Sequence, residues 1–285
     1  MEPTLVSVII TTHNRRDLVQ RAINSVYAQT YPNIELIVVD DHSDDGTSDV
    51  CKDPRIRYIY IPKDESRGGN YARNVGIKES RGEFCAFLDD DDYWLPTKIE
   101  KQVILIQKQE CELVYCGKLK EIVKDDGIEY VESLPVPKLC GDMSKKILYA
   151  ICTTTTNMLV MRQALLDVGM FDDNLEFWQE YELLIRLAQR KPFYYVNEPL
   201  SVYRIDVRDN SRLTNKYFSW RGAVRYIHRK HADLYRQLGL FEKYRVRNLI
   251  WRDAARRCKS SGLSGRYLLY RLLYFPYLIG GKLRK

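Results

Sequence analysis

The stretch EFCAFLDDDD, residues 83–92, decides the fold class of this chain. Residues 83–88 are mostly apolar, and four aspartates, Asp89 to Asp92, follow them directly. A short apolar run bounded by polar residues predicts a strand that is buried inside a sheet. In an open α/β sheet, ligands bind beyond the carboxyl ends of the strands. The stretch therefore predicts a buried strand with a ligand site at its end.

The sequence around this stretch alternates between strand and helix patterns. Three further strands are predicted by apolar, β-branched runs at residues 5–11, 34–39 and 56–61. Three helices are predicted between and after the strands, at residues 15–29, 69–80 and 97–109. Asn14 is the predicted N-cap of the first helix. This alternation predicts an α/β fold with a mostly parallel central sheet and helices on both faces.

Beyond residue 110 the predicted elements are more mixed. Strands are expected at residues 112–131, with Asp126–Gly127 as a turn, at 157–161 and at 193–204, where Pro199 interrupts the strand. Helices are expected at residues 143–150, 162–169 and 179–190. A polar segment at 206–215 predicts a loop. We therefore expect an α/β domain over residues 1–215 and a helical, basic and aromatic C-terminal region over residues 216–285.

The charge of the chain is unevenly distributed. Its 285 residues carry a net charge of +7, but residues 201–285 contain 21 basic and 5 acidic residues, so their net charge is +16. A basic segment of this kind favours an anionic partner, which is a membrane surface, a nucleic acid or a phosphorylated substrate. The acidic body and the lack of recognition motifs argue against a nucleic acid. Seven cysteines without any C-x-x-C pair predict reduced thiols in a cytoplasmic protein.

Polar residues follow three of the predicted strands. These ends are residues 11–15, the pair Asp40 and Asp41, and the run from Asp89 to Asp92. Carboxylates at this density repel one another unless a cation neutralises them, and oxygen ligands suit Mg²⁺ or Mn²⁺. A solvated acidic turn is the alternative interpretation. The pattern predicts a divalent cation site at the carboxyl edge of the sheet.

Four stretches of the chain resemble the family 2 glycosyltransferases, which have the GT-A fold. They are VSVIITTHNR (6–15), IELIVVDDHSDDGT (34–47), GGNYARNVGIKESRGEFCAFLDDDDYWLP (68–96) and VGMFDDNLEFWQEYELLIRLA (168–188). They occur in the family's order and span about residues 5 to 205. The resemblance implies an inverting enzyme with a nucleotide-sugar donor and a divalent cation, Mn²⁺ or Mg²⁺. It also implies a donor-binding half at 1–110 and an acceptor-binding half at 111–215.

The resemblance implies roles for individual residues at the strand ends. Thr11 and Asp40 match positions that hold the nucleobase, while Asp41 and Arg73 match positions that support the site. Asp91 overlays the residue of the D-x-D motif that binds the metal. The residues that we predict to bind the donor are Thr11, Thr12, Asn14, Arg15, Asp40, Asp41, Arg73, Asp89 and Asp90.

An inverting transfer needs a general base that takes the proton of the acceptor hydroxyl. The family supplies it from an acidic residue at the start of a helix, commonly Glu-Asp before an aromatic residue. Here Gln179 and Glu180 occupy those two positions, so Glu180 is the predicted base and Glu182 is the competing candidate. The helix N-terminus is expected to lower the pKa of Glu180 and keep it ionised.

Further residues are candidates for contacts with the acceptor or the diphosphate. Many relatives have a histidine after the position of Arg204, and here Asp206 stands nearest to that place. Arg208 or Arg212 is the alternative for the diphosphate. Trp178, together with Trp94 and Phe177, is a candidate for stacking on a sugar ring.

The C-terminal segment from Tyr267 to Ile279 is apolar and aromatic and is flanked by basic residues. It is too short to span a membrane, but its composition is typical of an interfacial helix. The alternative is packing on the catalytic domain or on a second copy of the chain. We expect transfer of a hexose or N-acetylhexosamine from a UDP-sugar to a lipid-pyrophosphate-linked glycan in bacterial polysaccharide biosynthesis, at the inner face of the cytoplasmic membrane. A nucleotidyltransferase-like enzyme and a nucleic-acid-binding protein are the alternative functions.

Overall fold

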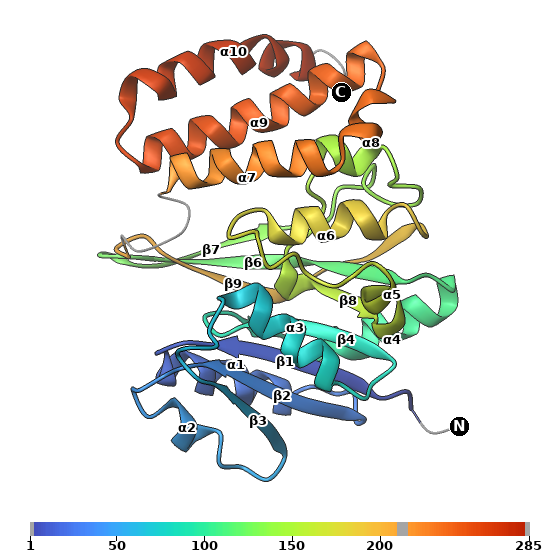
Figure 1. Ribbon diagram of the computed structural model, residues 1–285, viewed down its shortest axis with the longest axis vertical. Coiled ribbons are helices and arrows are strands. Elements are labelled where there is room, and N and C mark those ends of the chain that lie inside the picture. The colour runs from blue at the N-terminus through green and yellow to red at the C-terminus, as the bar shows by residue number, and fades with distance from the viewer. Residues whose placement is uncertain (1–2, 210–215, 283–285) are drawn as a thin grey trace. The chain divides into compact units, whose positions relative to one another are not determined.

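The chain divides into two compact units in a computed structural model, which describes residues 3–209 and 216–282, with the side chains described up to residue 273. The first unit comprises Met1–Ser144 and Cys152–Arg208, and the second comprises Lys145–Ile151 and Asp209–Lys285. The first unit contains the sheet, and the described part of the second is helical (Figure 1). The boundary predicted at residue 215 stays a prediction, because it falls among residues that the structure does not describe.

Four parallel strands form the first half of the sheet. They are β1 (Val6–Thr12), β2 (Ile34–Asp41), β3 (Ile56–Ile61) and β4 (Phe84–Asp89), in the order β3-β2-β1-β4. Each strand coincides with a predicted apolar run. The register pairs Thr11 with Asp89 on one side, and Thr12 with Asp40 on the other. The polar residues that follow these strands therefore meet at one edge of the sheet.

Helices cover both faces of this half. The helices α1 (Arg16–Tyr27) and α4 (Lys98–Gln109) pack with β1 in one apolar core. On the opposite face lies α3 (Gly69–Glu79), and a Cβ at Gly76 would overlap the side chain of Ile9. Glycine at this position permits the close approach of α3 to β1.

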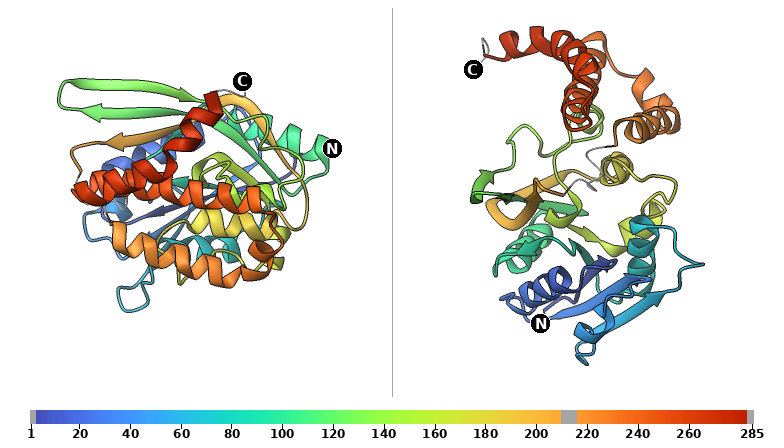
Figure 2. Two further views of the ribbon diagram at one scale, coloured as in Figure 1. Left: turned by 90° about the horizontal axis from the view of Figure 1, so that it is seen from above. Right: turned by 90° about the vertical axis from the view of Figure 1, so that its left-hand side faces the viewer.

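The second half of the sheet is mixed rather than parallel. Its strands are β5 (Tyr93–Trp94), β6 (Leu113–Lys124), β7 (Gly127–Ser133), β8 (Met158–Met161) and β9 (Phe193–Asp206). The order continues from β4 as β8-β6-β9-β5, and β7 forms a long hairpin with β6 (Figure 2). Of these pairings, β6 with β9 is parallel, while β8 runs antiparallel to both β4 and β6.

The expected interruption at Pro199 is wrong, because β9 is one continuous strand. Two register shifts opposite it, on either side of Gly117, accommodate the proline. The short elements of the first unit are α2 (Thr47–Val50), η2 (Thr155–Asn157), α5 (Arg162–Asp167) and α6 (Gln179–Leu187). The last of these carries the predicted base.

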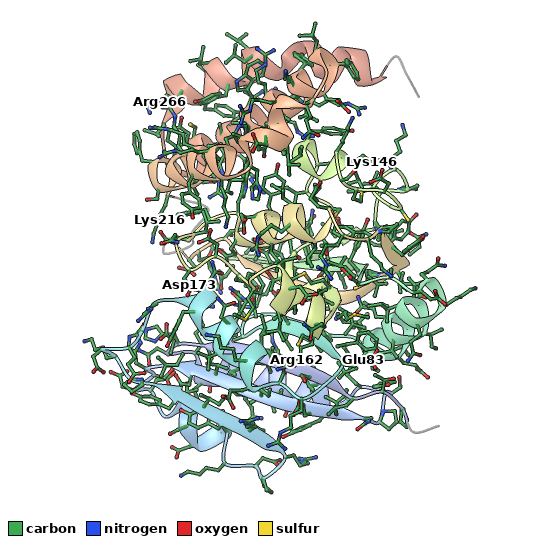
Figure 3. All side chains as sticks on the ribbon, turned by 45° about the vertical axis from the view of Figure 1, so that its right-hand side comes forward. Glu83, Lys146, Arg162, Asp173, Lys216 and Arg266 are labelled. Atoms are coloured by element: carbon green, nitrogen blue, oxygen red, sulfur yellow. The ribbon has the colours of Figure 1, made fainter. Side chains whose placement is uncertain are left out.

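The second unit contains η1 (Lys146–Tyr149), α7 (Tyr217–Lys230), α8 (Ala232–Arg236), α9 (Leu240–Ser260) and α10 (Ser264–Lys282). The expected helix at 143–150 is only the short 3₁₀ helix η1. Arg257 of α9 is buried over the Trp220 ring and pairs with Asp253. Arg266 of α10, which is labelled in Figure 3, lies over the rings of Tyr217 and Phe218. Within the described residues, no helix has the length and apolar character needed to cross a membrane.

Candidate active site

Two arginines converge on the aspartates that follow β4. Arg73 of α3 donates from Nη2 to Asp89 Oδ1 at 2.6 Å. Arg15, which precedes α1, donates from Nη1 to Asp90 Oδ1 at 2.8 Å and reaches Asp91 Oδ2 at 3.3 Å. Charge-assisted bonds of this kind fix the carboxylates in place. The two guanidinium groups neutralise only part of the negative charge of the aspartates.

Asp91, the predicted metal ligand, lies among like charges. Burial, together with the charges of Asp89 and Asp90, raises the pKa of Asp91 to about 6. No group of three or more acidic, histidine or cysteine side chains within the described ranges forms a complete metal site. In phosphate-transfer sites, Mg²⁺ or Mn²⁺ binds one or two carboxylates and takes its other ligands from phosphate and water. Asp91 would hold such a cation, with Asp89 close to it.

Asp92 has a structural position instead. Its side chain is buried, and it accepts a hydrogen bond from the Thr156 hydroxyl at 2.7 Å and from the Arg204 N–H at 3.0 Å. Burial, followed by the charges of Asp91 and Asp89, raises the pKa of Asp92 well above its ordinary value. Asp92 therefore ties the turn after β4 to β9.

The nucleobase contact of Asp40 stays a prediction, but its side chain already has protein partners. Its side chain is 0% exposed, and its two oxygens accept from the Ser43 N–H at 2.9 Å and from the Tyr58 hydroxyl at 2.7 Å. Asp40 lies on the face of β2 that also presents Leu36 and Val38 to the core. The neighbouring Asp41 lies on the other face of β2, is 9% exposed, and has its Oδ1 3.4 Å from His42 Nδ1.

The remaining residues of the first strand end differ in exposure. Thr11 is half-buried and lies beside Asp89, whereas Thr12 is buried on the core side. Asn14 is exposed and is not an N-cap, because α1 begins at Arg16 after Arg15. The side-chain oxygen of Asn14 accepts instead from the Asp44 N–H at 2.8 Å, and this bond joins two loops at the edge of the sheet.

Glu180 lies at the start of α6, close to the charged groups of the strand edge. Burial is the largest effect and raises the pKa of Glu180 overall, although the backbone hydrogen bond at the start of the helix lowers it as expected. The charges of Arg73 and, to a smaller extent, Lys118 also lower the pKa, while Asp89 raises it. A carboxylate with a raised pKa is a better proton acceptor.

Glu182, the competing candidate, is committed elsewhere. Its buried carboxylate accepts from Arg186 Nε at 3.0 Å and from Arg186 Nη2 at 2.6 Å. Arg186 also donates to the backbone carbonyl of Met170 at 2.6 Å. Glu182 therefore stabilises the approach to α6 rather than the site.

Gln179 and Arg73 link α6 to the aspartates. With its amide oriented to satisfy both atoms, Gln179 accepts from Arg73 Nη1 at 3.1 Å and donates to the Glu176 carbonyl at 2.8 Å. Arg73 also donates to Asp89, so one buried guanidinium bridges the end of β4 and the start of α6. The departure from Glu to Gln at position 179 thus leaves a neutral acceptor beside Arg73.

The aromatic residues proposed for sugar stacking are buried. Trp178 is 6% exposed, has a left-handed backbone conformation with φ of 56°, and packs edge-on against Tyr181 with ring centroids 5.1 Å apart. Trp94 and Phe177 are also buried, and the Trp94 indole donates to the Thr156 carbonyl at 3.0 Å. The stacking role of Trp178 stays a prediction, and its ring has little accessible surface in this structure.

At the end of β9, two predicted diphosphate contacts, Asp206 and Arg208, lie side by side. Arg208 donates to both oxygens of Asp206, from Nε at 2.8 Å and from Nη2 at 2.7 Å. These bonds from Arg208 lower the pKa of Asp206, although burial opposes them. The two residues pair with each other, and their contact with the diphosphate stays a prediction. Arg212 lies outside the described residues.

Sequence reasoning did not identify three charged residues near the site. Lys118 of β6 lies over the Tyr203 ring at 4.6 Å, and its charge influences Glu180. Glu121 of β6 and Arg21 of α1 form an ion pair at 3.2 Å beside the aspartate turn. The only signal in the sequence is that Lys118 and Glu121 interrupt a strand that is otherwise largely apolar.

Comparisons with known sequences give a consistent result. Residues 7–169 match the sequence profile described as Glycosyl transferase family 2. TuaG of Bacillus subtilis, which is named as a teichuronic acid biosynthesis glycosyltransferase, is 32% identical over 227 residues that cover 77% of this chain and 84% of TuaG. The UDP-Glc:alpha-D-GlcNAc-diphosphoundecaprenol beta-1,3-glucosyltransferase WfaP of Escherichia coli is 39% identical over 144 residues, which cover 50% of this chain and 56% of WfaP.

Solved structures share the fold at low sequence identity. TarS of S. aureus in complex with UDP-GlcNAc has a TM-score of 0.60 and 16% identity, and the match covers 97% of this chain and 92% of that structure. The mannosyltransferase PcManGT of Pyrobaculum calidifontis in complex with GDP-Man and Mn²⁺ has a TM-score of 0.59 and 18% identity, with coverage of 100% and 87%. From the profile match over more than half of its length and this shared GT-A fold, we conclude that the chain is a glycosyltransferase and belongs to glycosyl transferase family 2.

Proposed function

We propose that the chain transfers a hexose or N-acetylhexosamine from a UDP-sugar to a glycan hydroxyl, with inversion at the anomeric carbon. The observation that supports this most is the convergence of Glu180, Arg73 and the Asp89–Asp91 cluster at one edge of the sheet. The acceptor oxygen attacks the anomeric carbon, its proton passes to the Glu180 carboxylate, and the bond to UDP breaks. Glu180 is thus the general base of a single displacement.

The other residues bind and orient the donor. Asp41 and Thr11 hold the nucleobase, and Asp89 or Asp90 contacts the ribose or sugar. Asp91 would hold Mn²⁺ or Mg²⁺, and the cation would supply Lewis-acid stabilisation of the departing diphosphate. Arg73 keeps Asp89 and the start of α6 in register, so that the base and the donor site stay together.

We propose an acceptor that is a lipid-pyrophosphate-linked glycan of bacterial polysaccharide biosynthesis. The names of two relatives support this, since WfaP is named for a diphosphoundecaprenol-linked acceptor and TuaG for teichuronic acid. A UDP donor is supported by the name of WfaP and by the UDP-GlcNAc bound to TarS. The chain spans only 56% of WfaP, so its substrate is carried over here as a proposal.

The second unit is proposed to bind the inner face of the cytoplasmic membrane peripherally. Leu268, Leu269 and Leu272 of α10 are exposed, with Leu272 at 71%, and they lie in the region of net charge +16. Exposed apolar side chains and cations together bind anionic bilayers. The L269E/L272E double variant should lose flotation with vesicles that contain phosphatidylglycerol, whereas I104E, at an exposed isoleucine of α4, should keep it. Equal flotation of the wild type, L269E/L272E and I104E would contradict this proposal. It would also be contradicted if the wild type were a dimer that did not bind vesicles and the double variant were a monomer.

The experiment that tests the enzymatic function compares sugar nucleotides. Thermal unfolding of the full chain is measured with UDP-, GDP- and TDP-sugars, with and without Mn²⁺, and UDP release is then followed with a lipid-linked acceptor. UDP-sugars should stabilise the protein only with Mn²⁺, because a ligand that binds the native state raises its stability. Release of pyrophosphate instead of UDP would favour the nucleotidyltransferase alternative, and binding of no sugar nucleotide would contradict the proposal.

A further inference from the structure

Glu121 of β6 is a buried carboxylate at which four other elements meet. It is 4% exposed, and its Oε1 accepts from Arg21 Nη1 of α1 at 3.2 Å and contacts Arg204 Nε of β9 at 3.4 Å. Its Oε2 accepts from the hydroxyls of Tyr93 in β5 at 3.0 Å and Tyr130 in β7 at 3.2 Å. Removing or moving this carboxylate would reduce the free energy of unfolding, because each of its partners would lose a buried hydrogen bond.

Arg21 connects Glu121 to the proposed cation-binding residue. While Nη1 binds Glu121, Nη2 donates to the backbone carbonyl of Asp91 at 2.6 Å. The guanidinium also lies over the Tyr93 ring at 4.7 Å. An arginine held on three sides has one orientation, so the carboxylate of Glu121 sets the position of the Asp91 peptide.

The other side of the same turn depends on Arg204. Its backbone N–H donates to Asp92 Oδ1 at 3.0 Å, and its side chain contacts Glu121. The turn itself is closed by the Asp92 N–H, which donates to the Asp89 carbonyl at 3.0 Å. Arg21 and Arg204, which bond to Asp91 and Asp92 of the turn after β4, therefore converge on one carboxylate from the second half of the sheet.

We propose that Glu121 is a positioning residue, which holds the Asp91 carboxylate in the orientation that a diphosphate-bound cation requires. The inference rests on the proposed function of Asp91. Groups that orient a metal ligand without touching the metal typically contribute about 10- to 100-fold to metal affinity. Glu121 acts through Arg21, so its removal should weaken the cation more than it changes the binding of UDP alone.

The test compares two buried carboxylates of the same strand region. Glu112 precedes β6 and accepts from Arg190 Nε at 2.8 Å and Nη2 at 3.0 Å, away from the aspartate turn. Mn²⁺ binding to the full chain at saturating UDP is measured by calorimetry for E121Q and E112Q, with the thermal midpoint recorded for each. Both variants should lose stability, but only E121Q should bind Mn²⁺ at least about tenfold more weakly.

Arg21→Lys provides a milder second variant. Lysine keeps a positive charge beside Glu121 but lacks the second arm that reaches the Asp91 carbonyl. R21K should weaken Mn²⁺ binding as E121Q does. The double variant should bind Mn²⁺ with about the affinity of the weaker-binding single variant, because both substitutions act through one contact. Unchanged Mn²⁺ affinity in E121Q or, if that variant does not fold, in R21K would overturn the inference. A wild-type protein that binds UDP without any effect of Mn²⁺ would overturn the proposed cation site and the inference together.

Discussion

Both carboxylate oxygens of Glu182 accept hydrogen bonds from Arg186, one helical turn further along α6, and the carboxylate is fully buried. The same guanidinium holds the Met170 carbonyl, so the pair anchors the chain that leads into the helix. Residues two apart on a helix point to different faces. Because Glu182 faces the interior with Arg186, Glu180 is the glutamate of this turn that is near Arg73 and Asp89.

Glu182→Gln should therefore reduce stability rather than catalysis. Removing one partner of a buried ion pair leaves the other charge uncompensated, which costs about 3–5 kcal/mol. Urea unfolding should show this loss, while turnover per folded molecule at low temperature stays within about twofold of the wild type. A stable variant without transfer activity would instead assign the base to Glu182.

Substitutions of Asp40 and of Asp41 should affect different quantities, the free energy of unfolding for Asp40 and the affinity for UDP for Asp41. Asp41→Asn should weaken UDP binding about tenfold, which corresponds to about 1.4 kcal/mol, because the nucleobase loses a charged acceptor. Asp40→Asn should leave UDP affinity nearly unchanged and reduce the free energy of unfolding by about 1–2 kcal/mol, since Asp40 holds Ser43 and Tyr58. Calorimetry with UDP and urea unfolding measure the two effects. The opposite assignment follows if Asp40→Asn is the variant with weak UDP binding.

Arg73→Lys should impair catalysis although it keeps the charge. A lysine cannot bind both Asp89 and Gln179, so the start of α6 loses its link to the donor site. We expect kcat/KM to fall at least about tenfold. The matched control is Arg57→Lys, which changes an arginine that pairs with Glu79 at the end of α3. If both variants retain wild-type kcat/KM, the bridge has no catalytic importance.

Lys98 predicts a pH-dependent stability. It is fully buried, donates to Gln102 Oε1 at 2.8 Å, and burial lowers the pKa of Lys98 to about 8. Below pH 8 the folded protein contains a buried ammonium group, and the full desolvation cost of that charge reduces its stability. Between pH 8 and the unfolded-state pKa of 10.5, Lys98 is neutral in the folded state but still protonated in the unfolded state, so stability rises with pH. The free energy of unfolding of the wild type should therefore rise by up to about 3 kcal/mol relative to Lys98→Met over this range. A constant difference between the two proteins from pH 7 to 10.5 would show that the ammonium is not destabilised.

The sequence predicts the parallel half of the sheet well, because β1, β2 and β4 are largely buried and appear as continuous apolar runs. The strand ends with their aspartates follow from the same pattern, so Asp89 to Asp91 are found without a structure. The alternation within β2 also predicts that Asp40 shares a face with Val38, which packs in the core.

The contacts that depend on distant segments could not be predicted. Trp178 is buried because a left-handed residue turns the chain into α6, and nothing in the local pattern indicates that turn. Glu121 meets Arg21 across 100 positions of sequence, and no periodicity relates the two. Continuity of β9 through Pro199 likewise depends on the register shift in β6.

The proposed base is tested most directly by Glu180→Gln with a UDP-sugar, Mn²⁺ and the lipid-linked acceptor. The amide keeps the size of the side chain but cannot take the acceptor proton. The account predicts donor binding within about threefold of the wild type and a loss of transfer of at least about 100-fold, as expected for removal of a general base. Transfer at the wild-type rate by Glu180→Gln would contradict the account.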